Sequence, residues 1–232
     1  MSEKTLFHGS PNLIEKPIYG YGNPHNDYGL GFYTTKEIEL AKEWACPQAD
    51  QDGFANEYLF SDEGLVTVNL QDKKYHILNW LALLLKHRTF RLSNDLAAAA
   101  KEYLLSHFFP DVQSADVIIG YRADDSYFSF ANAFLNSALS LAQLQSAMYL
   151  GNLGEQTVLM SKTAFQQLSF QTAHPALASQ YYVKRMSRDL QAREIYQAQR
   201  QLQQIKDAVY ILDIIREEWQ NDDARLFRNL SQ

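Results

Sequence analysis

Apolar residues recur with two different periods along the chain, and these periods predict where strands and helices lie. In residues 56–70, apolar positions flank the turn Asp62-Glu63-Gly64, which predicts two short strands. Residues 117–120 and 157–160 are compact apolar runs bounded by turn formers, and each is typical of a short buried strand. Strands are therefore expected in both the early and the middle part of the chain.

Helical spacing occurs between these strands. Gly and Pro punctuate the first third so densely that no long helix is expected before Thr34. Thr34 or Thr35 can then cap a helix whose apolar positions include Ile38 and Ala41 and which ends before Pro47. Three further helices are predicted over residues 77–87, 94–109 and 130–148, with a cap at the first residue of the second. Because strands and helices are intermixed, the predicted fold class is α+β.

Strand signals stop after His174-Pro175, and the rest of the chain is predicted to be helical. We expect residues 1–172 to form one domain and residues 173–232 to form an extension that packs on it or on a partner. The apolar residues of the extension step along one helical face by threes and fours: Leu202, Ile205, Val209, Leu212, Ile215 and Trp219.

The composition permits a sizeable core and argues against several classes of protein. Of the 232 residues, 46% are hydrophobic, and the formal net charge of -6 disfavours a molecule-wide attraction to nucleic acid or anionic lipid. A single cysteine, Cys46, allows no internal disulfide, and no Cys/His cluster has the spacing of a metal site, so no metal is expected. The polar N-terminus and the short apolar run at 77–85 predict neither a secretion signal nor a membrane span, so we expect a cytoplasmic protein.

Three short motifs follow one another in the first 45 residues. They are His8-Gly9-Ser10, then Gly29-Leu30-Gly31-Phe32-Tyr33-Thr34-Thr35, and then Ala41-Lys42-Glu43-Trp44-Ala45 on the ensuing helix. In this order they resemble the H-Y-[E/Q] branch of the ADP-ribosyltransferase superfamily, which includes poly(ADP-ribose) polymerases and many bacterial members. The separation of 25 residues between His8 and Tyr33 (33 - 8 = 25) suits that branch.

A later segment narrows the resemblance. Residues 116–125, Asp-Val-Ile-Ile-Gly-Tyr-Arg-Ala-Asp-Asp, resemble a segment of a little-characterised bacterial, toxin-like family of the same superfold, often found beside small antitoxin-like proteins. Members of that family pair this segment with His-Gly-Ser and with Asp-[Phe/Tyr]-Gly-x-Gly-Phe-Tyr-x-Thr, which matches residues 27–35 here. The resemblance covers roughly residues 5–170. It implies an ADP-ribosyltransferase-like core with a split antiparallel β-sheet, flanking helices and an NAD⁺ cleft between the halves of the sheet.

The resemblance implies that NAD⁺ binds as a substrate. His8 would hydrogen-bond the adenosine-side ribose, and Tyr33 would stack on the nicotinamide ring, because an aromatic face suits a pyridinium cation. The Gly9 backbone and the Ser10 hydroxyl would meet the carboxamide. The cofactor-binding residues that the resemblance implies are His8, Gly9, Ser10, Gly31, Phe32, Tyr33 and Thr35.

The third position of the family's triad is a carboxylate or an amide on a late strand, and the resemblance places Gln156 there. Glu155 is the alternative, since neighbours on a strand face opposite sides. The implied catalytic set is therefore His8, Tyr33 and Gln156. An amide lacks the negative charge that supports chain elongation, which leaves mono-ADP-ribosylation, NAD⁺ hydrolysis or weak activity.

The function implied by the resemblance is transfer of ADP-ribose from NAD⁺ to a protein or a nucleic acid, with release of nicotinamide. The setting it implies is the toxin of a toxin–antitoxin or phage-defence system, neutralised by a small antitoxin protein. The alternative is a non-catalytic module of degenerate fold that binds NAD⁺, ADP-ribose or another protein. Toxicity that disappears in His8→Ala or Tyr33→Ala would favour catalysis.

Several residues near these motifs have simpler interpretations. The string Asn56-Glu57-Tyr58 resembles the polymerase glutamate motif but comes too early, so Glu57 is interpreted as a surface residue at the start of a strand. Trp44 is expected to pack on its helix, and Asp124 and Asp125 to cap a turn.

Overall fold

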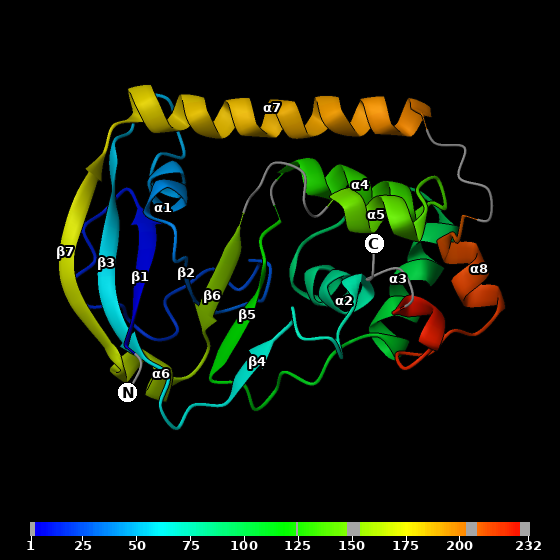
Figure 1. The fold of residues 1–232 in the computed structure, drawn as a ribbon, viewed down its shortest axis with the longest axis horizontal. Helices are drawn as coiled ribbons and strands as arrows, with labels where there is room; N and C mark the ends of the chain where they lie inside the picture. The colour runs from blue at the N-terminus through cyan, green and yellow to red at the C-terminus, as the bar shows by residue number, and fades with distance from the viewer. Residues whose placement is uncertain (1–2, 124, 148–153, 203–207, 228–232) are drawn as a thin grey trace.

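The computed structural model describes residues 3–123, 125–147, 154–202 and 208–227. Within these ranges, seven strands form two sheets that stand beside a group of helices (Figure 1). The mixed α+β class is thereby confirmed. The three-stranded sheet has the order β1-β3-β7, with the bounds Glu3–Ser10, Gly53–Ser61 and Leu168–Ala176. The four-stranded sheet has the order β2-β6-β5-β4, with the bounds Phe32–Thr34, Glu155–Leu159, Val117–Tyr121 and Thr67–Asn69.

The helices are divided between the two ends of the molecule. A group formed by α2, α3, α4, α5 and α8 lies at the end opposite the three-stranded sheet, and α1 lies against that sheet (Figure 1). The bounds of the helices are Ile38–Ala45 (α1), Ile77–His87 (α2), Asp95–His107 (α3), Asp125–Leu135 (α4), Leu141–Ala147 (α5), Lys162–Gln166 (α6), Ala178–Leu202 (α7) and Ile211–Arg216 (α8), with a short 3-10 helix at Ala224–Leu226.

The expectation of a wholly antiparallel sheet is wrong for one pair of strands. In the four-stranded sheet β2, β6 and β5 pair antiparallel, but β4 and β5 pair parallel, with Thr67 opposite Val117. The chain between β4 and β5 contains α2 and α3, and a long crossover of this kind is what parallel pairing requires. The two helices therefore enter the fold as the connection between neighbouring parallel strands.

The two sheets adjoin at a backbone bridge. Phe7 in β1 and Thr35 after β2 exchange two N–H···O bonds of 2.8 and 2.9 Å. Next to this bridge, His8 on one sheet lies beside Tyr33 on the other. The motifs that are 25 residues apart in the sequence are thus brought together by the junction of the sheets.

The early and middle helices follow the predicted pattern closely. The helix expected after Thr35 is α1, but the predicted cap at Thr34 or Thr35 is wrong, because the N-cap residue is Glu37 and no side chain caps the helix. The Thr35 hydroxyl instead accepts a hydrogen bond from the Glu37 amide, one residue before the helix begins. The helix predicted at 77–87 is α2. Asn94 caps α3 as expected, because its side chain accepts the Ala97 amide at 2.9 Å. These helices are confirmed.

Other parts of the secondary structure differ from the prediction. The single helix expected over 130–148 is two helices, α4 and α5, separated near Ser137, whose positive φ of 56° is incompatible with a continuous α-helix. No strand is predicted for residues 168–176, yet they form β7. This strand continues past 172, so the expected domain boundary falls inside it. The strand forms because these residues pair with β3, and hydrophobic periodicity does not account for it.

The expected single apolar stripe in the C-terminal region is wrong in part. After α7 the described chain resumes at 208 and begins a new helix, α8, whose buried residues are Ile211 and Ile214. Leu212, expected on the buried face, is 40% exposed, because the new helix has a different rotational phase. Ile205 lies outside the described residues. Ile211, Ile214 and Trp219 join the core formed by α2 to α5, so this part of the extension packs on its own chain.

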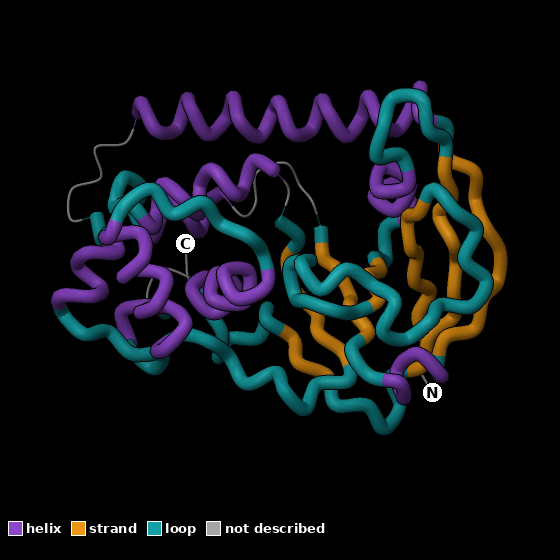
Figure 2. The backbone as a smooth tube through the Cα atoms, turned by 180° about the vertical axis from the view of Figure 1, so that it is seen from behind, coloured by secondary structure: helices purple, strands orange, loops and turns teal. Residues whose placement is uncertain are grey.

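The long helix α7 spans the molecule. It runs from the edge of the three-stranded sheet to a position above α4 in both views of the backbone (Figures 1 and 2), and it contacts α1 and α4. Arg188 in α7 pairs with the buried carboxylate of Glu43 in α1, with an N···O distance of 2.8 Å. This helix therefore connects the two ends of the molecule on one side.

Glu57 was expected at the start of an early strand, but it lies in the middle of β3. Its carboxylate is half-buried and contacts His174 of β7 at 2.5 Å. It is thus a cross-strand partner in the three-stranded sheet, separate from the junction between the sheets.

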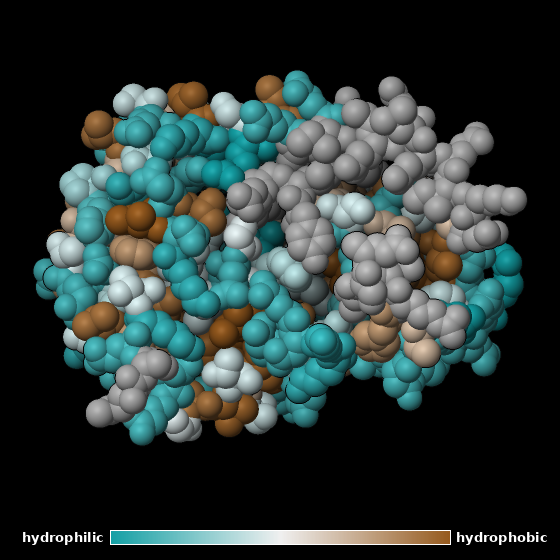
Figure 3. All heavy atoms as spheres, viewed as in Figure 1, coloured by the Kyte–Doolittle hydropathy of each residue, from teal (hydrophilic) through white to brown (hydrophobic). Residues whose placement is uncertain are grey.

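The surface shows no extended apolar area on the side drawn in Figure 3, where hydrophobic residues form small separate groups among hydrophilic ones. Among the described residues, no helix combines the length and apolar composition needed to cross a bilayer. Nor do the described His, Cys, Asp and Glu side chains form any group of three or more that could hold a metal ion. Cys46 is buried and free.

Candidate active site at the junction of the sheets

A polar cavity of about 250 Å³ opens at the junction of the two sheets. The three residues expected to form the catalytic set, His8, Tyr33 and Gln156, all line it, although they come from β1, β2 and β6. The remaining lining residues come from β1, from α1 and from loops that end near the junction: Gly9, Asn26, Asp27, Trp44, Arg88, Arg122 and Ala123.

His8 presents a neutral imidazole to this cavity. Its Nδ1 lies 2.7 Å from the carbonyl oxygen of Tyr33, and because a carbonyl can only accept, Nδ1 carries the proton. Nε2 is then the unprotonated nitrogen and can accept a hydrogen bond from a ligand. The ring stacks on Phe32 with centroids 4.3 Å apart. Desolvation by the surrounding protein lowers the pKa of His8, which favours the neutral ring, while the bond to the Tyr33 carbonyl selects the tautomer.

Tyr33 uses its hydroxyl to hold the preceding loop. The hydroxyl donates to the Gly29 carbonyl at 2.7 Å and accepts the Tyr28 amide at 3.0 Å. Burial raises the pKa of the phenol far above neutrality. Gly29 has φ of +82°, a conformation that suits glycine, and a side chain there would meet the ring of His87. The hydroxyl is therefore structural, and the aromatic ring is what Tyr33 offers a ligand.

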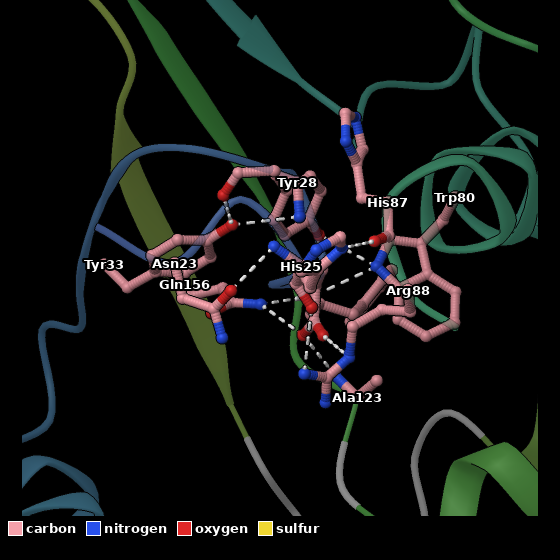
Figure 4. Close-up of polar contacts among 12 residues, drawn as sticks. Asn23, His25, Tyr28, Tyr33, Trp80, His87, Arg88, Ala123 and Gln156 are labelled. Atoms are coloured by element: carbon pink, nitrogen blue, oxygen red, sulfur yellow. Dashed lines mark hydrogen bonds and ion pairs between the residues drawn. The ribbon is translucent and has the colours of Figure 1, made fainter. Parts of the chain in front are cut away.

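Gln156 is almost completely buried, at 2% exposure, and its amide is oriented by two acceptors. Its Nε2 donates to Asp27 Oδ2 at 3.1 Å and to the Tyr121 carbonyl at 3.0 Å (Figure 4). Both amide hydrogens have acceptors, so the side-chain oxygen is the atom that can accept from a ligand. Glu155, the alternative, faces the other way: it pairs with Lys36 at 2.8 Å and lines a different cavity.

Asp27 is a cavity residue that opens the second motif but was not expected to have a role in the site. Its carboxylate is 6% exposed and accepts the Ala123 amide at 3.0 Å in addition to the Gln156 amide. Arg88, which follows α2, places its Nε 3.2 Å from Asp27 Oδ1. Burial raises the pKa of Asp27, and the donors and Arg88 oppose that shift. Its position directly before Tyr28-Gly29 was the only sequence signal.

A buried hydrogen-bond network supports the cavity from behind. Tyr28 donates to the Tyr121 carbonyl at 2.6 Å, and the Trp80 indole donates to the Tyr28 hydroxyl at 2.8 Å (Figure 4). Tyr28 and Trp80 are 1% and 2% exposed. A Cβ on Gly120 would lie 2.3 Å from the Tyr28 hydroxyl, so glycine is needed for this approach. The network connects β5, α2 and the loop that carries Asp27.

Trp44 and Arg122 form another part of the cavity wall. Trp44 was expected only to pack on α1, but it lines the cavity, and the Arg122 guanidinium carbon lies 4.4 Å from its ring centroid. Arg122 belongs to the segment 116–125, which resembles a segment of the bacterial family described above, but the resemblance implies no role for this residue. Within that segment, Asp124 lies outside the described residues, and the backbone of Asp125 begins α4.

The other expected cofactor-binding residues are spread over several environments. Gly9 lines the cavity, but a Cβ there would lie 2.0 Å from the Ala41 carbonyl oxygen, so packing against α1 explains the glycine. Ser10 is buried and accepts the Asn12 amide at 3.1 Å, and it is absent from the cavity lining. Thr35 is fully buried next to the start of α1. Gly31 and Phe32 line a second cavity.

The second cavity, of about 480 Å³, adjoins the polar cavity. It shares these two residues and Asn26 with the polar cavity. Its wall is mostly apolar or aromatic and comes largely from the loop after β1: Leu13, Ile18, Tyr19, Tyr21, Leu30, Phe32 and Phe165 contribute the large side chains. His8 and Tyr33 thus line both a polar cavity and an apolar one.

The fold and the site together define an α+β protein with a polar cavity at the junction of two sheets. Comparison with known families places it more narrowly: the chain belongs to the family described as "Protein of unknown function (DUF3990)", whose model matches residues 4–170. The matched range contains all the residues that line the polar cavity. No curated protein and no solved structure matches the chain.

Proposed function

We propose that this protein is an NAD⁺-dependent ADP-ribosyltransferase and that the polar cavity is its active site. The observation that carries the proposal is the convergence of His8, Tyr33 and Gln156 on one cavity from three strands in two sheets. These residues were chosen from sequence motifs alone, and neighbouring candidates such as Glu155 and Glu57 lie elsewhere. Unrelated structural residues have no reason to converge in this way.

The reaction breaks the bond between the nicotinamide nitrogen and C1′ of the ribose. The bonding electron pair leaves with nicotinamide, which becomes neutral, and positive charge develops on the ribose. A nucleophile of the acceptor then bonds to C1′ and loses its proton. Little proton transfer by the protein is needed, so holding the substrate in a reactive geometry is the main task.

The cavity supplies groups suited to that task. The Nε2 of His8 and the side-chain oxygen of Gln156 are acceptors that can receive hydrogen bonds from ribose hydroxyls. The ring of Tyr33 offers an aromatic face for the pyridinium. The carboxylate of Asp27 lies beside Gln156, so the cavity contains an acid although the third position itself is an amide.

The test is incubation of the purified protein with NAD⁺ labelled in its ADP-ribose part, in a cell lysate that contains nucleic acid. We expect release of nicotinamide and labelling of a macromolecule, and nuclease or protease treatment of the product then identifies the acceptor class. Gln156→Ala should lose both signals. Glu155→Ala is the matched control on the adjacent position of β6, outside the cavity, and should keep them. Equal activity in the two variants contradicts the proposal.

A second function is favoured because the cavity lacks an unpaired negative charge at the third position of the triad. Gln156 carries no charge, and the carboxylate of Asp27 faces Arg88, so a non-catalytic module that binds NAD⁺ or ADP-ribose is the alternative. Such a module would bind ADP-ribose in calorimetry and release no nicotinamide. Under the transferase proposal, the biological setting is a toxin or defence component held by a small antitoxin, and co-expressed antitoxin should remove toxicity that Tyr33→Ala also removes.

A further inference from the structure

One wall of the polar cavity is rich in hydrogen-bond donors. The indole N–H of Trp44 is buried and has no hydrogen-bond partner among the described residues, although Trp44 lines the cavity. A buried donor without an acceptor is unfavourable, so such a group calls for a ligand or another explanation. The Arg122 guanidinium lies over the same indole, 4.4 Å from the ring centroid.

The charges that line the cavity favour an anionic ligand. The lining side chains include two guanidinium groups, of Arg88 and Arg122, and one carboxylate, of Asp27. Arg88 is engaged by Asp27 and by the His25 carbonyl, to which it donates at 3.2 Å. This excess of positive groups stands out in a chain whose formal net charge is -6. A field of this sign in a cavity attracts negative charge.

We propose that Arg122 and Trp44 form a subsite for the diphosphate group of the substrate. This rests on the proposed function and deepens it: the cavity would select nucleoside diphosphate derivatives over nucleosides that lack phosphates. A planar guanidinium can hold two phosphate oxygens at once, and an indole N–H can donate to a third. Stacking on Trp44 restricts the orientation of Arg122, so less conformational freedom is lost when the anion binds.

The position of the subsite agrees with the roles proposed for the other residues. Trp44 and Gly9 line the same cavity as His8, and α1 and β1 bring them together, since Gly9 packs on the α1 backbone. A diphosphate held by Trp44 and Arg122 would therefore lie next to the acceptor nitrogen of His8. The ribose that His8 is proposed to bind is joined to the diphosphate, as the dinucleotide requires.

The test measures binding of three probes to the full chain by isothermal titration calorimetry: inorganic pyrophosphate, ADP-ribose and adenosine. Arg122→Gln should weaken both phosphate-bearing probes by about tenfold or more, because a charge-assisted bidentate contact is lost, and should leave adenosine unchanged. Trp44→Phe keeps the aromatic ring and removes the donor, so a smaller loss, of about three- to tenfold, is expected for the same two probes.

The chain offers a close control for Arg122. Arg225 also stacks on a tryptophan, with its guanidinium carbon 4.0 Å from the Trp219 ring centroid, but it lies in the C-terminal segment away from the cavity. Arg225→Gln should bind all three probes as the unaltered chain does. Arg122→Lys keeps the charge without the planar fork and should be intermediate. Circular dichroism verifies that each variant is folded.

Pyrophosphate and ADP-ribose binding that is equal in Arg122→Gln and the unaltered chain overturns the subsite. Weak binding of every probe by the unaltered chain overturns it as well. Loss of pyrophosphate binding in Arg122→Gln without any turnover of NAD⁺ supports the subsite and removes the proposed transferase. If the unaltered chain turns over NAD⁺ and Arg122→Gln binds pyrophosphate as well as the unaltered chain does, the transferase is supported and the subsite is overturned. The two proposals can therefore fail separately.

Discussion

The two cavities that meet at His8 and Tyr33 differ in how firmly their walls are held. In the polar cavity, Asp27 and Gln156 are 6% and 2% exposed and are bonded to each other and to backbone groups of neighbouring strands. In the apolar cavity, Ile18 and Tyr21 are 68% and 84% exposed and belong to a loop rich in glycine. One wall is fixed by a network, and the other is a surface of exposed side chains.

This difference indicates where chemistry and where adaptable binding would take place. Groups that stabilise a developing charge act best when they are already in position, because no reorganisation is needed during the reaction. The polar cavity meets that requirement. Exposed aromatic residues on a loop can adjust to ligands of different shape, which suits an acceptor more than a reacting bond. Substitutions on the two sides should therefore affect different measurements.

The largest effect is expected for His8→Ala, because His8 lines both cavities. The variant loses the acceptor for a ribose hydroxyl and the bond to the Tyr33 carbonyl. We expect nicotinamide release to fall by about 100-fold or more, and the free energy of unfolding to fall by about 1–3 kcal/mol because that carbonyl loses its partner. Kinetic assays and urea unfolding measure the two effects.

His174→Ala is the control for this variant. His174 lies in the three-stranded sheet, where it contacts Glu57, and it lines neither cavity. Its substitution should leave nicotinamide release within about twofold of the unaltered chain, since the partly exposed pair with Glu57 that it breaks contributes little to stability. If nicotinamide release falls by a comparable factor in both variants, His8 supports the structure of the sheet and does not act in the site.

A large effect on the polar side alone is expected for Gln156→Glu. The introduced carboxylate would replace a donor that lies 3.1 Å from Asp27 Oδ2 and would face the Tyr121 carbonyl. Two carboxylates at this distance raise each other's pKa, so the folded state binds a proton that the unfolded state has released. The variant should therefore be least stable at high pH and recover stability as the pH falls towards 5.

We expect a loss of about 1–3 kcal/mol at pH 8 for Gln156→Glu, together with lower activity. Urea unfolding at pH 5.5 and pH 8 measures the slope. An increase in nicotinamide release would instead mean that the site accepts the polymerase-type glutamate, and that the amide limits the natural reaction.

Much of this arrangement could be predicted from the sequence, and the reasons for the failures are local. His8, Tyr33 and Gln156 were found because motif order survives in the sequence, and α2 was found because its apolar run is long and ends in charged residues. Asp27, Arg88 and Arg122 were missed as site residues. Each lies in a loop, and only the distant pairing of strands and helices brings the three together.

The same reason explains the missed elements of the fold. The mixed polar and apolar residues of β7 carry no clear period of two, and its strand structure depends on pairing with β3. The parallel pairing of β4 with β5 follows from a crossover of two helices, which no local pattern specifies. Gly9 shows the opposite case, since its motif was recognised but its packing on α1 was not.

A moderate effect on pH dependence is expected from His8. Burial lowers its pKa below the ordinary 6.5, so the folded state keeps Nε2 unprotonated at a pH where an ordinary histidine would be charged. Binding of ADP-ribose should therefore change little between pH 8 and 6.5 and weaken only below that. The unfolded chain takes up a proton near pH 6.5 that the folded chain does not, so stability should fall as the pH is lowered further.

His8→Gln removes the titrating group and should flatten both curves in calorimetry and in urea unfolding. His76 supplies an internal comparison, because burial lowers its pKa to about 4 but it lies outside both cavities. His76→Gln should flatten the stability curve and leave the binding curve unchanged. Half-maximal ADP-ribose binding near pH 6.5 in the unaltered chain would contradict the neutral, buried state of His8.

A smaller effect is expected for Tyr33→Phe than for Tyr33→Ala. Phenylalanine keeps the ring that lines both cavities but removes the bonds to the Gly29 carbonyl and the Tyr28 amide. We expect a loss of about 1–2 kcal/mol in the free energy of unfolding and a loss of activity below about tenfold. Tyr33→Ala should lose nearly all activity. If Tyr33→Phe and Tyr33→Ala lose activity to the same extent, the hydroxyl of Tyr33 and not its ring is the catalytic group.

The smallest effect on stability is expected for Tyr21→Ala, and this variant also tests the role of the apolar cavity most directly. Tyr21 is 84% exposed and lines only the apolar cavity, so its loss should change the free energy of unfolding by less than about 0.5 kcal/mol. Hydrolysis of NAD⁺ without acceptor should be unchanged, because the polar cavity is intact. Labelling of the macromolecule should fall if the exposed aromatic surface contacts the acceptor. A parallel fall in hydrolysis and labelling would instead mean that the substrate itself extends into the apolar cavity, and that the two walls serve a single ligand.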